Sequence, residues 1–114
     1  MDMINTVTPP AARAELKVRI TRVETIPLRI PLIVPVKIAS GAARPAVEVM
    51  LVRLHTDQGV TGIGETQAWR RAGSSETLAS LASVINEHFA PLIVGRSPFA
   101  IGAIMCELDA AIYH

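Results

Sequence analysis

The sequence predicts an α+β domain in which a three-stranded antiparallel meander precedes a small helical bundle. Residues 17–30 alternate between apolar and polar side chains, which is the period of a half-buried strand. Two further strand-like segments, 47–56 and 60–65, are separated by the turn-forming sequence TDQGV. Beyond residue 76 the apolar side chains recur at the three- and four-residue spacing of amphipathic helices.

The composition fits one small domain without a nucleic-acid or membrane partner. Of 114 residues, 50% are hydrophobic and 18% are charged, and the net charge is +1. No basic stripe is visible, and one Trp and one Tyr offer little stacking surface, which argues against nucleic-acid binding. The N-terminus lacks the apolar core of a signal peptide. No apolar run reaches the roughly 20 residues of a membrane span, so we expect a soluble protein, and the single cysteine fits a cytoplasmic, reducing compartment.

The chain is expected to begin with a mobile tail, residues 1–16, which are small, polar and interrupted by proline. The domain itself is predicted to occupy 17–114. In its first strand, Pro27 and Pro31 cannot donate to a ladder, so the later part should lie at an edge or a bulge. Residues 32–46 follow as a predicted loop, and a loop of this length in a compact domain is more often functional than decorative.

The second and third strands are predicted to form a hairpin. Residues 47–56 are apolar on most of both faces, as expected for a central strand. Gly59 is placed to take a positive φ in the connection. Gly62 and Gly64 lie within the third strand and indicate a bulge or the close approach of another backbone.

Two helices are expected to complete the domain. Ser74 or Ser75 is predicted to cap the first helix, and Pro91 to bound it. Ser97 and Pro98 give a strong start signal for the second. The predicted buried stripes are Leu78, Leu81, Ala82, Ile85 and Phe89 in the first helix, and Ile101, Ile104, Met105, Leu108 and Ile112 in the second. The second stripe still runs at His114 with no capping residue, so we expect a domain that is truncated at its C-terminus.

Few polar residues have the partners that catalysis or metal binding needs. Glu65 has no second carboxylate, His or Lys at acid–base spacing and is expected to be a structural carboxylate that bonds loop backbone or an arginine. A solvated or partner-contacting face is the favoured interpretation of Arg70 and Arg71, the alternative being a clamp on a substrate carboxylate. Lys37 is expected to be a solvated loop tip, the alternative being contact with an anionic group, and His55 and His88 are expected to be structural. Glu107 and Asp109 are two residues apart on a helix and face different directions, so they are not expected to form a metal pair. The single cysteine, Cys106, excludes an internal disulfide, and its apolar helical pattern predicts a buried, unreactive thiol.

The order and spacing of these segments resemble a known domain. The segments VETIPLRIPL, VEVMLVRLHTDQGVTGIGET, SSETLASLASVINEHFAPLIVGRSPFAI and ELDAAI together resemble the N-terminal capping domain of the enolase superfamily, in its mandelate racemase and muconate lactonizing branch. The resemblance covers about residues 17 to 112. In that family the domain packs over the mouth of a (β/α)7β barrel, which carries the metal-binding carboxylates and the Lys or His acid–base residues.

The resemblance implies a function for the parent enzyme. Such an enzyme abstracts a proton α to the carboxylate of a small substrate and stabilises the enediolate on Mg²⁺. The resemblance implies that the catalytic and metal residues lie on the missing barrel domain, with none in this chain. The 114 residues alone would then bind no cofactor and be inactive, and the parent enzyme would be a homo-oligomer. The motif GIGE stands where many relatives have GWGE, and neither the substrate nor the reaction subtype follows from the sequence.

Two loops close the substrate pocket in family members, and they correspond here to residues 32–46 and 65–75. The resemblance therefore implies pocket-lining roles for Val36, Ile38, Ala39, Thr66 and Trp69. For Trp69 the alternative is an amphipathic residue that anchors its loop on the helices. For the whole chain the alternative is a self-standing interaction module that covers its apolar helix face by pairing with copies of itself.

Overall fold

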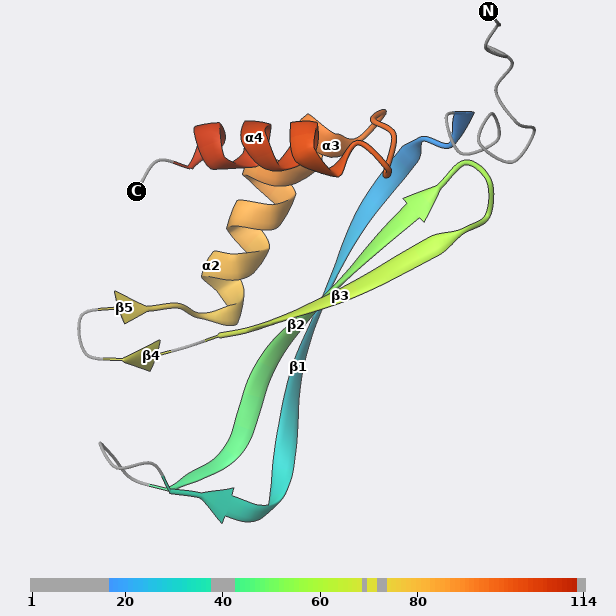
Figure 1. Cartoon of the computed structure of the whole chain (residues 1–114). Helices are drawn as coiled ribbons and strands as arrows, with labels where there is room; N and C mark the ends of the chain where they lie inside the picture. Colours follow the sequence, from blue (N-terminus) through green and yellow to red (C-terminus); the bar gives the residue numbers. More distant parts are fainter. Residues whose placement is uncertain (1–16, 38–42, 69, 72–73, 113–114) are drawn as a thin grey trace, which may run out of the picture.

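A computed structural model describes residues 17–37, 43–68, 70–71 and 74–112. The predicted architecture is confirmed: a three-stranded antiparallel sheet, in the order β1-β2-β3, precedes the helices (Figure 1). The strands are β1 (Ile20–Val36), β2 (Arg44–Thr56) and β3 (Thr61–Gln67). A short antiparallel pair, β4 (Arg70–Arg71) with β5 (Ser74–Ser75), connects the sheet to the first helix.

The connection between β1 and β2 is shorter than the predicted loop 32–46. Pro31 still pairs with Ala46, and Val36 pairs with Arg44 after a register shift. The shift leaves residues 32–35 without partners in β2. Pro31 and Pro35 therefore lie at an irregularity in the pairing, and the strand continues beyond it. The connection therefore comprises residues 37–43, of which 38–42 lie outside the described residues.

The hairpin between β2 and β3 is regular. Gly59 has a φ of 76°, as predicted. The register from Val49↔Gln67 to His55↔Thr61 contains no shift, so the predicted bulge at Gly62 and Gly64 is wrong. A Cβ added at either glycine would meet nothing within 4 Å in the described structure. Within that structure no helix contacts β3, which leaves this strand outside the helical layer.

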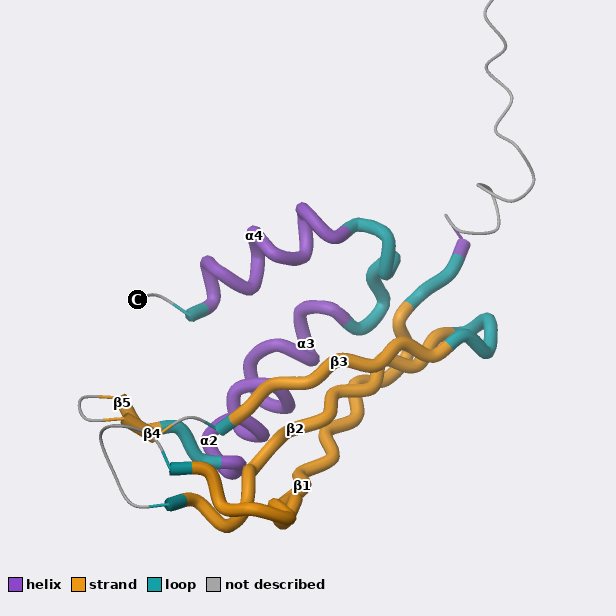
Figure 2. Tube along the Cα trace, turned by 60° about the horizontal axis from the view of Figure 1, so that its bottom comes forward, coloured by secondary structure: helices purple, strands orange, loops and turns teal. Residues whose placement is uncertain are grey.

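The helices cover one face of β1 and β2. A continuous helical run comprises α2 (Leu78–Ser83), the π-helical segment η1 (Val84–Phe89) and α3 (Ala90–Ile93). Asn86 donates to the Thr25 hydroxyl at 3.0 Å, and the fully buried Met50 lies on the same face as Thr25. The last helix, α4 (Ile101–Ala111), contacts α3 and η1 and lies farther from the sheet (Figure 2).

The first helix begins at a cap that the sequence interpretation missed. Ser74 and Ser75, the predicted caps, pair instead with Arg70–Arg71. Thr77 is the N-cap: its hydroxyl accepts from the Ser80 N–H at 3.0 Å, and the Ser80 hydroxyl accepts from the Thr77 N–H at 2.9 Å. This reciprocal pair satisfies two backbone donors, which explains why the helix begins after Thr77.

The helical run passes through Pro91, which was predicted to bound it. A proline ring collides with the carbonyl four residues earlier in a regular α-helix. Here the preceding turns are wider, and the Ala90 N–H bonds to the Ile85 carbonyl five residues back. The π-helical turns thus accommodate Pro91 near the start of α3, where its missing N–H costs little.

The start of α4 was predicted too early. Ser97 forms a turn instead: its carbonyl accepts from the Ala100 N–H at 3.1 Å and its hydroxyl from the Phe99 N–H at 3.3 Å. The helix begins at Ile101. Two backbone bonds join the preceding turn to the start of β1, from the Gly95 N–H to Ile20 O at 2.7 Å and from the Ile20 N–H to Arg96 O at 2.9 Å. Gly95 has a φ of 89°, which only glycine adopts without strain.

The exposed side of α4 contradicts two burial predictions. Cys106 is exposed, not buried. Ile101 and Met105 of the predicted buried stripe are 66% and 49% exposed. The physical reason is that α4 contacts other described elements through α3 and η1 alone, so part of its apolar surface has nothing over it.

Candidate functional site

The first predicted pocket-lining segment lies at the end of the sheet remote from the β2–β3 turn (Figure 1). Val36, at the end of β1, is 52% exposed, and the unpaired Ile33 and Val34 before it are 101% and 72% exposed. Ile38 and Ala39 lie outside the described residues. This end of β1 therefore presents apolar side chains to solvent with no described residue covering them, which is unusual for a self-contained domain.

The second predicted segment starts on a well-fixed strand. Thr66 pairs with Met50 in the sheet and is half-buried. Ala68 is 5% exposed, and its N–H donates to the Glu48 carbonyl at 3.0 Å, which extends the β2–β3 pairing. Trp69, the predicted pocket wall, lies outside the described residues.

The contacts of the Glu65 side chain differ from those predicted. Glu65 pairs with Leu51 in the sheet and its side chain is exposed. The carboxylate makes no ion pair or hydrogen bond with any residue of the described ranges. The expected structural bond is therefore not found there, because the side chain points into solvent.

A hollow of about 470 Å³ is lined in part by residues of both segments. Its lining residues come from β1, from the start of β2 and from the end of β3: Arg29, Arg44, Pro45, Ala46, Glu48 and Ala68. Arg44, Pro45, Ala46 and Ala68 fall within the two predicted loops, whereas Arg29 and Glu48 lie outside them. The alternation of β1 and β2 could have placed Arg29 opposite Glu48, but the contribution of Ala68 depends on a long-range pairing that no local pattern reveals.

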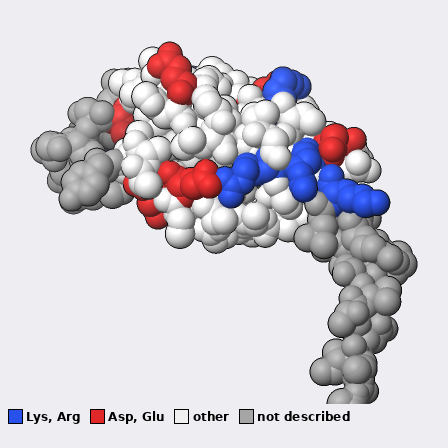
Figure 3. All heavy atoms as spheres, turned by 90° about the horizontal axis from the view of Figure 1, so that it is seen from above, with Lys and Arg blue, Asp and Glu red and all other residues white. Residues whose placement is uncertain are grey.

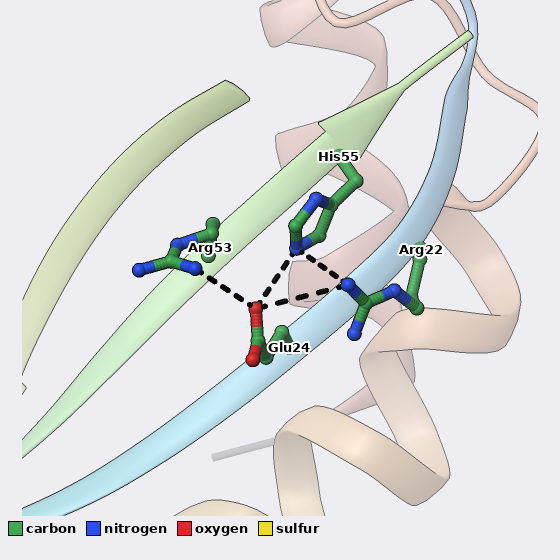
Figure 4. Close-up of polar contacts among 4 residues, drawn as sticks. All are labelled: Arg22, Glu24, Arg53 and His55. Atoms are coloured by element: carbon green, nitrogen blue, oxygen red, sulfur yellow. Dashed lines mark hydrogen bonds and ion pairs between the residues drawn. The ribbon is translucent and has the colours of Figure 1, made fainter. Parts of the chain in front are cut away.

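A second polar cluster occupies the sheet face opposite the helices (Figure 4). The Glu24 Oε1 atom on β1 lies 2.9 Å from Nε2 of His55 and 3.5 Å from the Arg53 guanidinium, both on β2. The Arg22 guanidinium lies 3.9 Å from the same oxygen and 3.0 Å from the His55 Nε2 atom. His55 was expected to be structural, and its contacts with Arg22 and Glu24 across β1 and β2 agree with that expectation.

The surroundings of Glu24 lower its pKa. The hydrogen bond from His55 lowers the pKa of Glu24 most. Burial raises this pKa, and the charges of Arg53, Arg22 and His55 lower it further. These contacts favour the ionised carboxylate in the folded state. The cluster holds β1 and β2 in register, since Arg22 pairs with His55 and Glu24 with Arg53 across the strands.

Glu24→Gln is expected to reduce stability in a pH-dependent way. Because the pKa of Glu24 is lower in the folded state than its ordinary value of 4.5, its contribution is fully present above that value. The contribution is lost as the pH falls through the folded-state pKa. Urea unfolding should therefore give a lower midpoint for the variant at pH 7 and nearly equal midpoints at pH 2. A difference that grew toward low pH would contradict this sign, and Glu65→Gln is the matched control.

Among the side chains that the structure describes, the other charged residues do not gather into a further site. Arg96 forms an ion pair with Glu107 beside α4, and His88 is exposed on η1. In the face shown in Figure 3, a short row of basic side chains has acidic ones at one end and beside it. Among the described residues no three His, Cys, Asp or Glu side chains are grouped so that they could hold a metal ion. None of the helices in those ranges is long and apolar enough to cross a membrane.

Comparison with known proteins identifies relatives of the whole fold. The profile of the family described as "Mandelate racemase / muconate lactonizing enzyme, N-terminal domain" matches residues 20–114. A curated relative, chloromuconate cycloisomerase from Cupriavidus pinatubonensis, is 32% identical over 68 residues, which are 55% of this chain and 17% of the relative.

Two solved structures illustrate the likeness. Muconate lactonizing enzyme from Pseudomonas fluorescens, complexed with muconolactone, has a TM-score of 0.74 and 29% identity over 83% of this chain and 26% of its own. An enolase superfamily member from Roseovarius nubinhibens, complexed with magnesium, has a TM-score of 0.69 and 26% identity over 84% of this chain and 25% of its own. The chain thus spans about a quarter of the length of these enzymes.

Proposed function

Because the chain belongs to the mandelate racemase/muconate lactonizing enzyme family as its N-terminal domain, we propose that it caps a barrel domain and helps to close a substrate pocket there. Several relatives are racemases, epimerases or cycloisomerases whose chains are about four times as long as the matched part. The parent protein is then an isomerase-type enzyme, and the barrel is the partner of this chain.

The observation that carries the proposal is the position of the two pocket segments. Arg44, Pro45 and Ala46, which lie in the predicted loop 32–46, line the same hollow as Ala68, which lies in the predicted loop 65–75. The exposed apolar residues Ile33, Val34 and Val36 stand at this end of the sheet. A barrel mouth placed against this end would cover them, and their burial would exclude water from the enclosed substrate.

The chemistry proposed for the parent enzyme is proton abstraction α to a carboxylate. Magnesium would supply charge stabilisation of the enediolate and would be held by the barrel, since the described part of this chain has no group of three possible ligands. The contribution of this chain is to shape the pocket and exclude water. Val36, Ile38, Ala39, Thr66 and Trp69 are the residues proposed to line it.

The experiment measures exchange of the α-proton for solvent deuterium in the full-length protein. A panel of N-acylated amino acids, dipeptides and lactones that carry a carboxymethyl group is followed by NMR in D2O with Mg²⁺ or with EDTA. We expect exchange of at least one substrate with Mg²⁺ and none with EDTA. Replacing 37–43 by an Asn-Gly turn should lower the exchange rate about tenfold or more with an unchanged melting temperature, because water then enters the pocket. An unchanged rate would contradict the capping role.

One observation favours a second function, that of a self-associating module. Phe99, Ile101 and Met105 are 57%, 66% and 49% exposed around the start of α4. Such side chains are suited to pairing with a second copy. Light scattering on the isolated chain distinguishes the two: a compact dimer with cooperative melting favours the module, whereas aggregation or binding of a hydrophobic dye favours a domain that lacks its barrel.

A further inference from the structure

The outer edge of β3 is uncovered. β3 is the last strand of the sheet on the side away from β1 (Figure 2), and among the described elements it contacts β2 alone. Residues 61–65 are all exposed. The outer edge of such a strand carries a row of unpaired N–H and C=O groups, which another extended strand can use as a template.

The hydrogen-bonding pattern shows which residues of β3 direct their backbone groups outward. The Ala68 N–H donates to the Glu48 carbonyl, so these two residues form a hydrogen-bonded pair just beyond the end of β3. Hydrogen-bonded and non-hydrogen-bonded pairs alternate along an antiparallel ladder, and the register of β2 with β3 contains no shift. Three exposed residues therefore direct their N–H and C=O groups to the outer edge: Thr61, Ile63 and Glu65.

The two outer edges of the sheet differ in their protection. On β1, Pro27 pairs with Met50 and Pro31 pairs with Ala46. Both partners are two residues from Glu48 along β2, so they direct their backbone groups toward β3, as Glu48 does. Each proline thus stands where an N–H would face the outer edge of β1, and it blocks the addition of a strand there. β3 has no proline, no lysine and no bulge, so its edge is left open.

Two glycines within β3 have no explanation inside the described structure. Gly62 and Gly64 weaken the strand, yet neither has a positive φ and neither lies at a bulge. A Cβ added to either would meet nothing within 4 Å. Glycine inside a strand also indicates the close approach of another backbone. Since no described residue makes that approach, the glycines point to a backbone supplied from elsewhere.

We propose that two copies of the protein pair through β3, antiparallel and about a two-fold axis at Ile63, so that their sheets become one continuous sheet. In this register Ile63, which is 66% exposed, lies opposite the partner's Ile63. Thr61 lies opposite the partner's Glu65, and Gly62 lies opposite the partner's Gly64. The outward backbone groups of the two strands then form about six main-chain hydrogen bonds.

β3 is complementary to itself in this register. The glycines meet at non-hydrogen-bonded pairs, where opposite Cα atoms lie only about 4.5 Å apart. Glu65, the one charged residue of β3, lies opposite a threonine hydroxyl and not opposite the partner's Glu65, so like charges do not face each other. A two-fold contact of this kind is complete with two copies. It leaves the exposed end of β1 free, so it does not depend on the capping function.

The test is the formation of a disulfide between two copies of the full-length protein under mild oxidation. Ile63→Cys places two thiols opposite each other at the axis with Cα atoms about 5.5 Å apart, a separation that a disulfide spans. Thr61→Cys is the matched control on the same face of β3, because its two copies would lie about 13 Å apart. Non-reducing electrophoresis should show at least about ten times more linked dimer for Ile63→Cys. All other cysteines are the same in both variants and cannot produce the difference.

Ile63→Pro tests the outward N–H itself. This N–H takes no part in the pairing with β2, so the substitution imitates the prolines of β1 and should keep the far-UV circular dichroism spectrum of the parent protein. Light scattering over a dilution series should show a dissociation constant for self-association that is raised at least about tenfold. Ile63→Ala keeps the N–H and should stay within about twofold of the parent protein.

Equal amounts of linked dimer in Ile63→Cys and Thr61→Cys would overturn the inference. A strand from elsewhere in the same chain on the edge of β3 would give that result, and so would a dimer formed through the exposed residues of α4. Equal self-association of Ile63→Pro and Ile63→Ala would also overturn it. If Ile63→Pro does not fold, the comparison of the two cysteine variants decides.

Discussion

Met50→Ala is expected to lower the free energy of unfolding by about 2–5 kcal/mol, the usual range for removing a large buried side chain. Met50 is fully buried at the centre of the sheet, between Pro27 on β1 and Thr66 on β3. The substitution removes apolar contacts and leaves a cavity that the paired strands cannot fill by moving, because the backbone ladder fixes their spacing.

Urea unfolding followed by far-UV circular dichroism measures this loss. Ile63→Ala is the control, because Ile63 lies on β3 and is 66% exposed. Its substitution should change the free energy of unfolding by no more than about 0.5 kcal/mol. Similar losses for the two variants would show that Met50 does not stand at the centre of the core.

The order of the elements could be predicted because each carries a local signal. Alternation marks β1, the apolar run marks β2, and Gly59 fixes the hairpin between β2 and β3. Each of these signals depends on residues that are close in sequence, so the order of the elements can be predicted without knowledge of the packing.

The errors arose where competing local signals had to be resolved by packing. Pro31 looks like the end of a strand, yet its pairing with Ala46 and the shift after it carry β1 on to Val36. Ser75 and Thr77 are both good caps, and the reciprocal bonds of Thr77 with Ser80 decide between them. Such choices depend on which backbone donors remain unsatisfied, and the residue types alone do not specify this.

The candidate site was predictable only where the resemblance named its loops. The hollow needs Arg29, Glu48 and Ala68 to meet, and these positions come together through the register of three strands. The cluster around Glu24 has the same origin, since Arg22 and His55 are 33 residues apart. Sequence spacing predicts neither the hollow nor the Glu24 cluster, because the register of two strands is set by the geometry of the connecting turn and by which face is buried.

The exposed end of β1 yields the second large effect. Under the capping function proposed above, replacing Ile33 and Val34 together by Asp is expected to lower kcat/KM of the full-length protein at least about 100-fold. Burying each of these side chains contributes about 1.5–3 kcal/mol, so two of them bias the closed pocket by roughly 3–6 kcal/mol. Carboxylates at these positions would have to be desolvated for the pocket to close, which shifts the equilibrium toward the open, wet state. Steady-state kinetics on the substrate found by deuterium exchange measures the loss.

Val60→Asp separates this role from a general effect of charge on the surface. Val60 is 64% exposed, comparable with Val34, but it stands at the β2–β3 turn, at the other end of the sheet (Figure 1). It should leave kcat/KM within about twofold of the parent protein, because no pocket segment lies beside it. The double variant should keep the parent melting temperature, since Ile33 and Val34 have no described partners to lose. Equal loss of activity in both variants would mean that the end of β1 is not the closing edge, and the apolar residues there would need another explanation.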